Sequence, residues 1–365
     1  MLLGLITVEV SMSTPLGGEV IEDLATPDEV PTKRRRKSSD PKPSELAGKS
    51  PTQIAMTRLV RDKVAVVCAG ILVVLVLLAL LAPLICDWLN IYADTGSPGA
   101  PRPSEVLDQD PVNGNPGYPL FGPPFHDFTW DHPLGIQPRS GLDNLALILY
   151  GLRTSLLVAT LATVSSVVVG VTMGLLAGYS RGWVDQVLSF IIDFLLSFPF
   201  VLGALALAPI ITSRFGGDAS ALQRAELLSL VGILLLFGWM GLARLIRGQV
   251  LSLREREFIL AARVIGVPTW RVLFKELLPN LVAPIVVAFS LALPGYVAAE
   301  AGLSFLGVGL TESVSLGRMI NDGANYSQTY TLYLWAPVIT VMVLVVALNL
   351  LGDSVRDAFD PKTRR

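Results

Sequence analysis

Charged residues and cysteines are both scarce in this chain, and each scarcity excludes a class of protein. Among the 365 residues 16 % are charged and 52 % are hydrophobic, and the mean hydropathy is +0.58. Soluble domains carry about 25 % charged residues, so this composition indicates a polytopic membrane protein. The cysteines, Cys68 and Cys86, would lie about 27 Å apart along a helix, which excludes a disulfide between them. No thiol chemistry follows from them.

A nucleotide-binding loop is also missing. Such a loop needs Gly, four residues and then Gly-Lys-Ser/Thr after a strand. The nearest match is Gly48-Lys49-Ser50, but Pro43 stands where the first glycine is required. The sequence therefore predicts that this chain does not hydrolyse ATP and binds no cofactor of its own.

Long apolar runs are present instead. A membrane-spanning helix needs about 20 apolar residues. We expect an all-α protein with six spans: 64–85, 154–179, 187–211, 227–246, 281–303 and 334–351. The third and fifth contain internal prolines (Pro199 and Pro209, then Pro284 and Pro294), which predicts kinked helices in a bundle.

Lysine and arginine cluster on one side of these spans, and cytoplasmic loops carry such an excess. One cluster precedes the first span, one lies within residues 247–275, and one is at the end of the chain. We therefore expect both termini and the segment 254–279 in the cytoplasm. Residues 33–37 (KRRRK) are better explained by attraction to anionic lipid than by nucleic acid.

The chain divides into a membrane domain and two tails. Residues 1–57 are rich in Pro, Ser and charge and are expected to be a disordered cytoplasmic tail. The membrane domain is expected at 58–353, with an outer loop at 86–143, and a C-terminal tail at 354–365. The first ten residues lack the basic region of a signal peptide, so we place the natural start at Met12.

The segment 254–279 is the least expected feature of a membrane protein. In its first half the charged residues lie at 254–257 and 263, and Gly266 and Pro268 predict the end of a first short helix. Helical spacing predicts an apolar face made of Phe258, Ile259, Ala262, Ile265 and Gly266. A second helix should place Trp270, Phe274 and Leu277 on one face and stop at Pro279. Two short helices are therefore expected to project from the membrane as a docking surface.

This segment resembles the EAA loop of ATP-binding-cassette importer permeases, through AARVIG at 261–266 and ELLP at 276–279. The resemblance implies that this loop binds a partner ATPase. It implies coupling roles for six residues: Ala261, Ala262, Arg263, Gly266, Leu278 and Pro279. Two positions depart from the family pattern, because the leading glutamate is Leu260 here and Glu276 stands where many relatives have histidine.

Further motifs extend the resemblance from residue 58 to the C-terminus: HPLG at 132–135, GLRTSL at 151–156, LSFLGVG at 303–309 and NLLGD at 349–353. Together they resemble the C-type permease subunit of dipeptide, oligopeptide and nickel importers. The resemblance implies a type I importer permease fold with cytoplasmic coupling helices. It also implies four kinds of partner: a second homologous permease, two cytoplasmic ATPases that use ATP and Mg, an extracellular binding protein, and membrane lipid.

Two acidic residues fall inside predicted spans, Asp193 and Glu300. An ionised carboxylate at mid-bilayer costs about 2.5–3.5 kcal/mol. One of the two could face the translocation path and meet a peptide ammonium, or each could bind a neighbouring helix by hydrogen bonds. The histidines, His126 and His132, flank Asp127 and Asp131 and could suggest a metal site. The Pro- and Gly-rich surroundings favour a loop.

The function expected from these features is transport of peptides as a membrane subunit of an importer. The alternatives are a nickel or oligosaccharide importer, and a secondary transporter that works alone. The last would require intramembrane charge pairs or an inverted repeat. It would also leave the segment 254–279 without a purpose.

Overall fold

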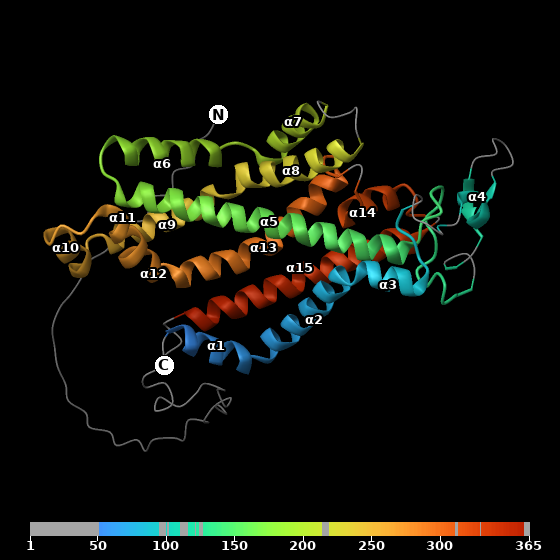
Figure 1. The fold of residues 1–365 in the computed structure, drawn as a ribbon, viewed down its shortest axis with the longest axis horizontal. Helices are drawn as coiled ribbons and strands as arrows, with labels where there is room; N and C mark the ends of the chain where they lie inside the picture. Colours follow the sequence, from blue (N-terminus) through green and yellow to red (C-terminus); the bar gives the residue numbers. More distant parts are fainter. Residues whose placement is uncertain are drawn as a thin grey trace, which may run out of the picture. The chain divides into compact units, whose positions relative to one another are not determined.

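A computed structural model describes residues 51–94, 100, 102–109, 116–120, 122–123, 127–213, 219–310, 313–328 and 330–360. These residues form a bundle of helices (Figure 1). The longer helices are α1 (Pro51–Arg61), α2 (Lys63–Leu80), α3 (Ala82–Leu89), α5 (Asn144–Tyr179), α6 (Trp183–Leu196), α7 (Phe200–Thr212), α8 (Ala219–Gly238), α9 (Met240–Leu253), α10 (Glu257–Val264), α13 (Val282–Phe305), α14 (Leu316–Ala324) and α15 (Thr331–Phe359). Short helices are α4 (Pro103–Val106), α11 (Thr269–Arg271) and α12 (Leu278–Asn280), with a π-helix at Val272–Leu277.

The described residues are mostly helical, as the expected all-α class predicts, and one small sheet accompanies the helices. Strand β1 (Leu107–Gln109) pairs antiparallel with β2 (Pro116–Pro119), both within the predicted outer loop. Val106 and Leu107 are buried against Ile136 in a small separate core. The loop therefore buries its own apolar residues, and its backbone groups gain partners that a loop without strands would lack.

The predicted tail boundaries need correction. Helix α1 begins at Pro51, seven residues before the predicted start of the membrane domain at residue 58, because Ile54 and Ala55 are apolar and become buried. Helix α15 continues to Phe359, so the first half of the predicted C-terminal tail, residues 354–359, is helical. The two helices meet where Ser354 donates a hydrogen bond of 2.6 Å to the Asp62 carboxylate. Residues 1–50 of the tail that was predicted for residues 1–57, including KRRRK, lie outside the described residues.

Among the described residues, five helical segments are long and apolar enough to cross a membrane: 63–80, 144–179, 221–253, 282–305 and 331–359. A sixth span results if α6 and α7 are counted as one. These two helices are bent by 88° at Ser197–Pro199, far more than the kink predicted for a single span at 187–211. Proline cannot donate a backbone hydrogen bond, so α6 ends before Pro199 and α7 starts in a new direction.

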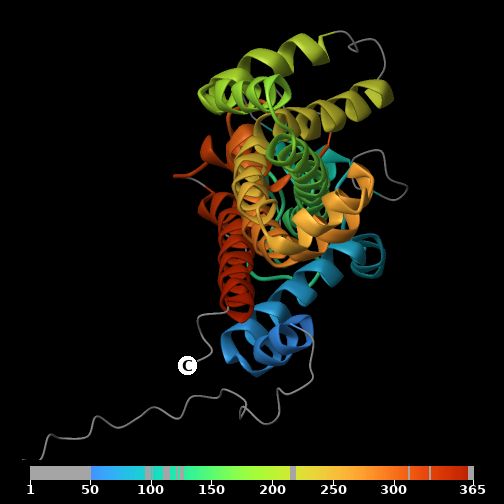
Figure 2. The same ribbon diagram turned by 90° about the vertical axis from the view of Figure 1, so that its left-hand side faces the viewer.

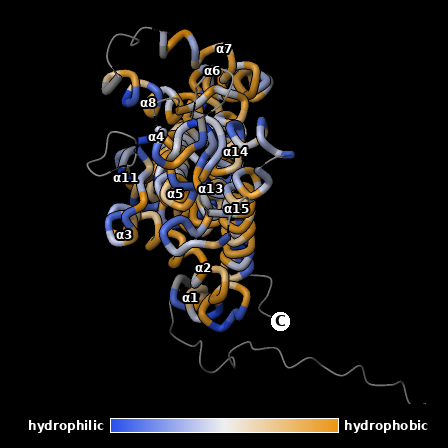
Figure 3. Tube along the Cα trace, turned by 90° about the vertical axis from the view of Figure 1, so that its right-hand side faces the viewer, coloured by the Kyte–Doolittle hydropathy of each residue, from blue (hydrophilic) through white to orange (hydrophobic). Residues whose placement is uncertain are grey.

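Helix α5 runs through the middle of the bundle (Figure 2). It begins ten residues before the predicted span, because the Asp143 carboxylate caps its first turn by accepting from the backbone N–H of Leu145 (2.8 Å) and Ala146 (3.3 Å). One end of the bundle carries α10 and α11, and the other carries α4 and α14 (Figure 1). Figure 3 looks onto this second end, where hydrophilic residues gather, while α2 and α15 are largely hydrophobic.

Candidate functional site

Helix α10 ends as the sequence predicts. Gly266 has φ +78°, a left-handed conformation that side chains other than glycine rarely adopt. The Val267 N–H then donates to the Ala262 carbonyl (3.0 Å), and the Gly266 N–H donates to the Arg263 carbonyl (3.1 Å). A Cβ at residue 266 would meet no atom within 4 Å, so the backbone conformation, not space, requires glycine here.

The second part of the segment differs from its prediction. Pro279 was expected to stop the helix, but α11, the π-helix and α12 follow one another without a break. Pro279 lies in the first turn of α12, where a missing N–H is tolerated. The chain turns instead at Leu281, with φ −98° and ψ −2°. The wider winding of the π-helix before Pro279 changes which residues face inward.

One side of the segment packs on the bundle. Ile259, Ala262, Val272, Leu273 and Leu277 are buried in one cluster. Their neighbours in that cluster include Leu175 of α5 and Ile246 and Val250 of α9. The segment is therefore anchored on the ends of α5 and α9.

The other side leaves large apolar side chains exposed. The predicted apolar faces are only partly buried, because Phe258, Ile265, Trp270 and Phe274 point away from the bundle. Val264 is 87 % exposed and Ile265 78 %. We call the exposed set the coupling surface: Phe258, Leu260, Val264, Ile265, Trp270 and Phe274. Large apolar side chains left exposed on one short segment are typical of a docking site.

The six residues predicted to couple occupy different environments. Ala261, Gly266 and Pro279 are exposed, and Arg263 and Leu278 are half-buried. Ala262 is buried against the chain's own cluster. The two departures from the family pattern also differ, since Leu260 is exposed within the coupling surface and Glu276 is half-buried.

The two membrane acids have opposite surroundings. Asp193 on α6 is exposed and forms an ion pair with Arg244 on α9. A second pair between the same helices joins Asp185 and Arg247 at 2.9 Å.

Glu300 on α13 is completely buried. The Ser304 hydroxyl donates to its Oε1 at 2.9 Å. The hydroxyls of Ser155 on α5 and Ser315 before α14 also lie beside the carboxyl group. Glu300 therefore joins three elements and does not reach the surface of this chain.

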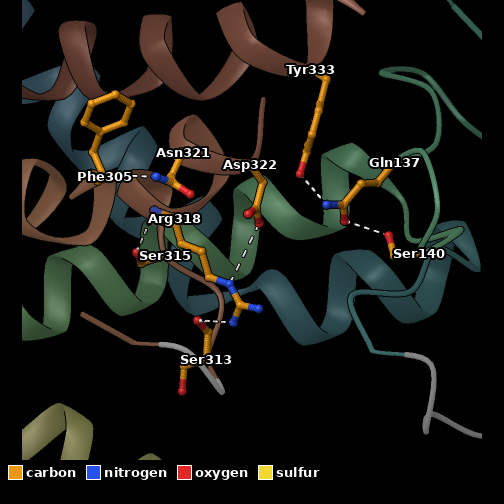
Figure 4. A network of polar contacts seen from close by, with 9 residues as sticks. All are labelled: Gln137, Ser140, Phe305, Ser313, Ser315, Arg318, Asn321, Asp322 and Tyr333. Atoms are coloured by element: carbon orange, nitrogen blue, oxygen red, sulfur yellow. Dashed lines mark hydrogen bonds and ion pairs between the residues drawn. The ribbon is translucent and has the colours of Figure 1, made fainter. Parts of the chain in front are cut away.

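A polar network lies at the other end of the bundle (Figure 4). The Arg318 guanidinium faces the Asp322 carboxylate at 3.8 Å, and Asn321 donates to the Phe305 carbonyl. Burial raises the pKa of Asp322, and Arg318 partly offsets this rise. Gln137 of the outer loop donates to the Tyr333 hydroxyl, which joins that loop to α15.

Of the two histidines considered from the sequence, the structure describes His132. His132 Nδ1 lies 2.8 Å from the Asp143 carboxylate, the residue that caps α5. His126 lies outside the described residues. Within the described ranges no three His, Cys, Asp or Glu side chains gather in a way that could hold a metal ion.

The described helices form a largely apolar bundle with large apolar side chains exposed at one end. Residues 170–365 match the family described as binding-protein-dependent transport system inner membrane component, and residues 50–98 match the N-terminal transmembrane domain of oligopeptide transport permease C. The chain therefore belongs to the binding-protein-dependent transport system inner membrane component family. It is a multi-pass permease subunit of importers, a class in which the permease is not itself the ATPase.

Individual relatives agree with this assignment. The chain is 32 % identical over 328 residues to the dipeptide transport system permease protein DppC of Alkalihalophilus pseudofirmus, covering 90 % of this chain and 95 % of that protein. It is 36 % identical over 225 residues to the oligopeptide transport system permease protein OppC of Mycobacterium tuberculosis, covering 61 % and 74 %. A solved chain of the inward-facing MetNI methionine ABC transporter is 20 % identical with a TM-score of 0.46, over 59 % of this chain and 96 % of that one.

Helices α5 and α9 are held together by glycines that were not predicted as functional from the sequence. Gly170, Gly174 and Gly178 line the side of α5 that meets α9. A Cβ on Gly174 would come within 2.7 Å of the Ala243 carbonyl oxygen, and one on Gly178 within 2.7 Å of the Val250 Cβ. The signal was available, because small residues spaced four apart are typical of close helix packing in membranes.

Proposed function

We propose that this chain is the C-type permease subunit of an importer that carries di- or oligopeptides across the bacterial plasma membrane. It would form the translocation path with a second, homologous permease and receive peptides from an extracellular binding protein. Two cytoplasmic ATPases, which use ATP and Mg, would bind the coupling surface. The names of the relatives, dipeptide and oligopeptide permeases, support the substrate class.

The observation that carries this proposal is the exposure of the coupling surface. Val264 and Ile265 are more than three quarters exposed, although the other side of the same segment is buried. Large apolar side chains at the end of a membrane bundle are stabilised when a partner protein covers them. The N-terminal helix α1 and the end of α15 lie toward this same end (Figure 1), which supports both termini being cytoplasmic.

The first experiment is co-purification. The chain would be expressed with its neighbouring coding sequences and solubilised, and the proposal expects ATPase subunits and a second permease to purify with it. ATP hydrolysis should then rise when a peptide-loaded binding protein is added. A chain that purifies alone and transports without ATP would instead be a secondary transporter.

Gly266→Asp tests the coupling surface itself. The substitution strains a backbone with φ +78° and places a charge beside Ile265, so peptide-stimulated ATP hydrolysis should be lost while membrane insertion is retained. Gly182→Asp is the matched control, because Gly182 also has a positive φ (+70°) and open space but lies between α5 and α6. Equal loss in both variants would refute the role of the coupling surface.

Leu260→Glu restores the acid that the family pattern has at this position. Leu260 is 42 % exposed within the coupling surface, so the added carboxylate can reach a partner without unfolding the segment. We expect ATPase stimulation that is unchanged or higher. Substrate class is tested separately by measuring which of a dipeptide, an oligosaccharide or Ni²⁺ binds the partner binding protein.

A further inference from the structure

We call residues 254–279 the coupling segment. Arg254 links the start of this segment to the end of α5, the longest of the described helices. Its guanidinium Nη1 donates to the backbone carbonyls of Gly178 (3.0 Å) and Ser180 (3.4 Å), where α5 ends. The last carbonyls of a helix lack partners within the helix and attract a cation. The Arg254 side chain is 19 % exposed, so this contact is largely shielded from water.

Arg263 makes a second contact to the same helix end. Its guanidinium carbon lies 4.8 Å from the centre of the Tyr179 ring, and Tyr179 is the last residue of α5. Arg263 lies in the last turn of α10, which carries part of the coupling surface. Arg254, which follows the last residue of α9, and Arg263, in the last turn of α10, therefore contact the end of α5 and the residue that follows it.

Helix α5 is suited to carry a displacement from this place. Its glycines pack it against α9, and α9 leads directly into the coupling segment. Its other end is capped by Asp143, which also pairs with His132 of the outer loop. A movement of α5 at its C-terminal end would thus also move its N-terminal end, where Asp143 and the outer loop are bound.

We propose that Arg254 and Arg263 are positioning residues that fasten the coupling surface to the end of α5, so that displacement of the coupling surface moves α5. This inference rests on the proposed function, because it supplies the partner that displaces the surface. It concerns transmission of movement and not binding of the partner.

The test uses the complete importer in proteoliposomes and measures peptide uptake per ATP hydrolysed. Arg254→Gln removes the guanidinium that bridges two carbonyls, and uptake per ATP should fall about fivefold, the scale of a coupling change of about 1 kcal/mol. The ATPase subunits should still co-purify. Arg254→Lys keeps a cation at the helix end and should recover part of the loss.

Arg181→Gln is the matched control. Arg181 follows Ser180 directly and its side chain is exposed, so the variant makes the same change of charge one residue from the contact. Its uptake per ATP should equal that of the unmodified complex. An Arg254→Gln complex with normal uptake per ATP, or one no worse than Arg181→Gln, would overturn the proposal.

If the complex with Arg254→Gln fails to assemble, the Tyr179→Leu variant tests the proposal instead. Leucine preserves apolar packing and removes the ring beneath Arg263, so uptake per ATP should fall while assembly is retained. An unchanged ratio in an assembled Tyr179→Leu complex would overturn the proposal. Failure of the proposed function looks different, since the unmodified chain would then not co-purify with an ATPase.

Discussion

The Asp193 carboxylate on α6 is paired with the Arg244 guanidinium on α9, although 61 % and 60 % of these side chains are exposed. Charged groups exposed to hydrocarbon are unfavourable, and pairing lowers that cost. Asp193 lies on α6, which runs in a different direction from α7 because of the bend at Ser197–Pro199. The pair therefore fixes α6 on α9 within a surface that is otherwise rich in apolar side chains.

Exchanging the two charges should separate a structural role from a role in transport. Asp193→Arg places two cations together, so the melting temperature of the purified complex should fall by roughly 2–4 °C for each kcal/mol lost. Adding Arg244→Asp restores the pair in reverse and should restore the melting temperature.

The peptide uptake of the double variant, Asp193→Arg with Arg244→Asp, shows whether Asp193 has a role in transport. If Asp193 only holds α6 in place, uptake returns together with stability. If the Asp193 carboxylate meets the peptide ammonium in the translocation path, stability returns and uptake does not. A double variant that stays as unstable as Asp193→Arg would contradict the pairing described here.

Glu300→Gln should be tolerated. The glutamine Oε1 can accept the same hydrogen bond from Ser304, so the free energy of unfolding should change by less than about 1 kcal/mol. Glu300→Ala leaves three buried serine hydroxyls beside a cavity and should cost about 2–4 kcal/mol. Thermal unfolding and peptide uptake of both variants provide the measurement. Normal uptake by Glu300→Gln would exclude a carboxylate role in the path.

Gly174→Ala should destabilise the contact between α5 and α9. The new methyl group would lie 2.7 Å from the Ala243 carbonyl oxygen and from the Ile246 Cβ, and overpacking of this kind costs about 1–3 kcal/mol. Gly248→Ala is the control, because a Cβ there meets nothing within 4 Å. The Gly174→Ala variant should therefore have a lower melting temperature than the Gly248→Ala variant. A Gly174→Ala protein as stable as the control would be inconsistent with close packing of α5 on α9.

Cys86 should react slowly with maleimide. Burial, with Asp143 and Asp87 nearby, raises the pKa of the Cys86 thiol from 9.0 to about 11. At pH 8 the reactive thiolate is then roughly a hundredfold rarer than for a thiol of pKa 9.0. In a Cys68→Ala background the labelling rate should rise about tenfold per pH unit up to about pH 11. A rate that levels off near pH 9 would show an ordinary thiol.

The same shift has a consequence for stability. The pKa of the Cys86 thiol is higher in the folded protein than in the unfolded chain. The stability that this difference gives to the folded protein is therefore present below pH 9 and is lost as the pH rises through about 11.

The membrane helices and the end of α10 could be predicted because their causes are local. Continuous apolar runs identify spans, and Gly266 ends a helix through its own backbone freedom. The start of α5 at Asn144 was missed because its cap, Asp143, lies in a polar loop outside the hydrophobic signal. The π-helix before Pro279 was missed because a change of winding leaves no periodic trace in six residues.

The candidate site was predictable in position but not in orientation. Spacing alone placed Ile259, Ile265 and Trp270 on apolar faces, and only Ile259 is buried. Which apolar residues turn inward depends on where α5 and α9 lie, and that depends on contacts distant in sequence. The grip of Arg254 on Gly178 and Ser180 spans more than 70 residues, so no local pattern could show it.

The unequal lengths of two membrane helices determine how the chain should respond to lipid. Helix α5 has 36 residues and is about 54 Å long, while the hydrocarbon layer is about 30 Å thick. Helix α2 has 18 residues and is about 27 Å long. In thicker bilayers α5 still spans the layer, whereas α2 must thin the surrounding lipid or draw in its flanking residues. Acyl-chain length should therefore act on this permease through α2 far more than through α5.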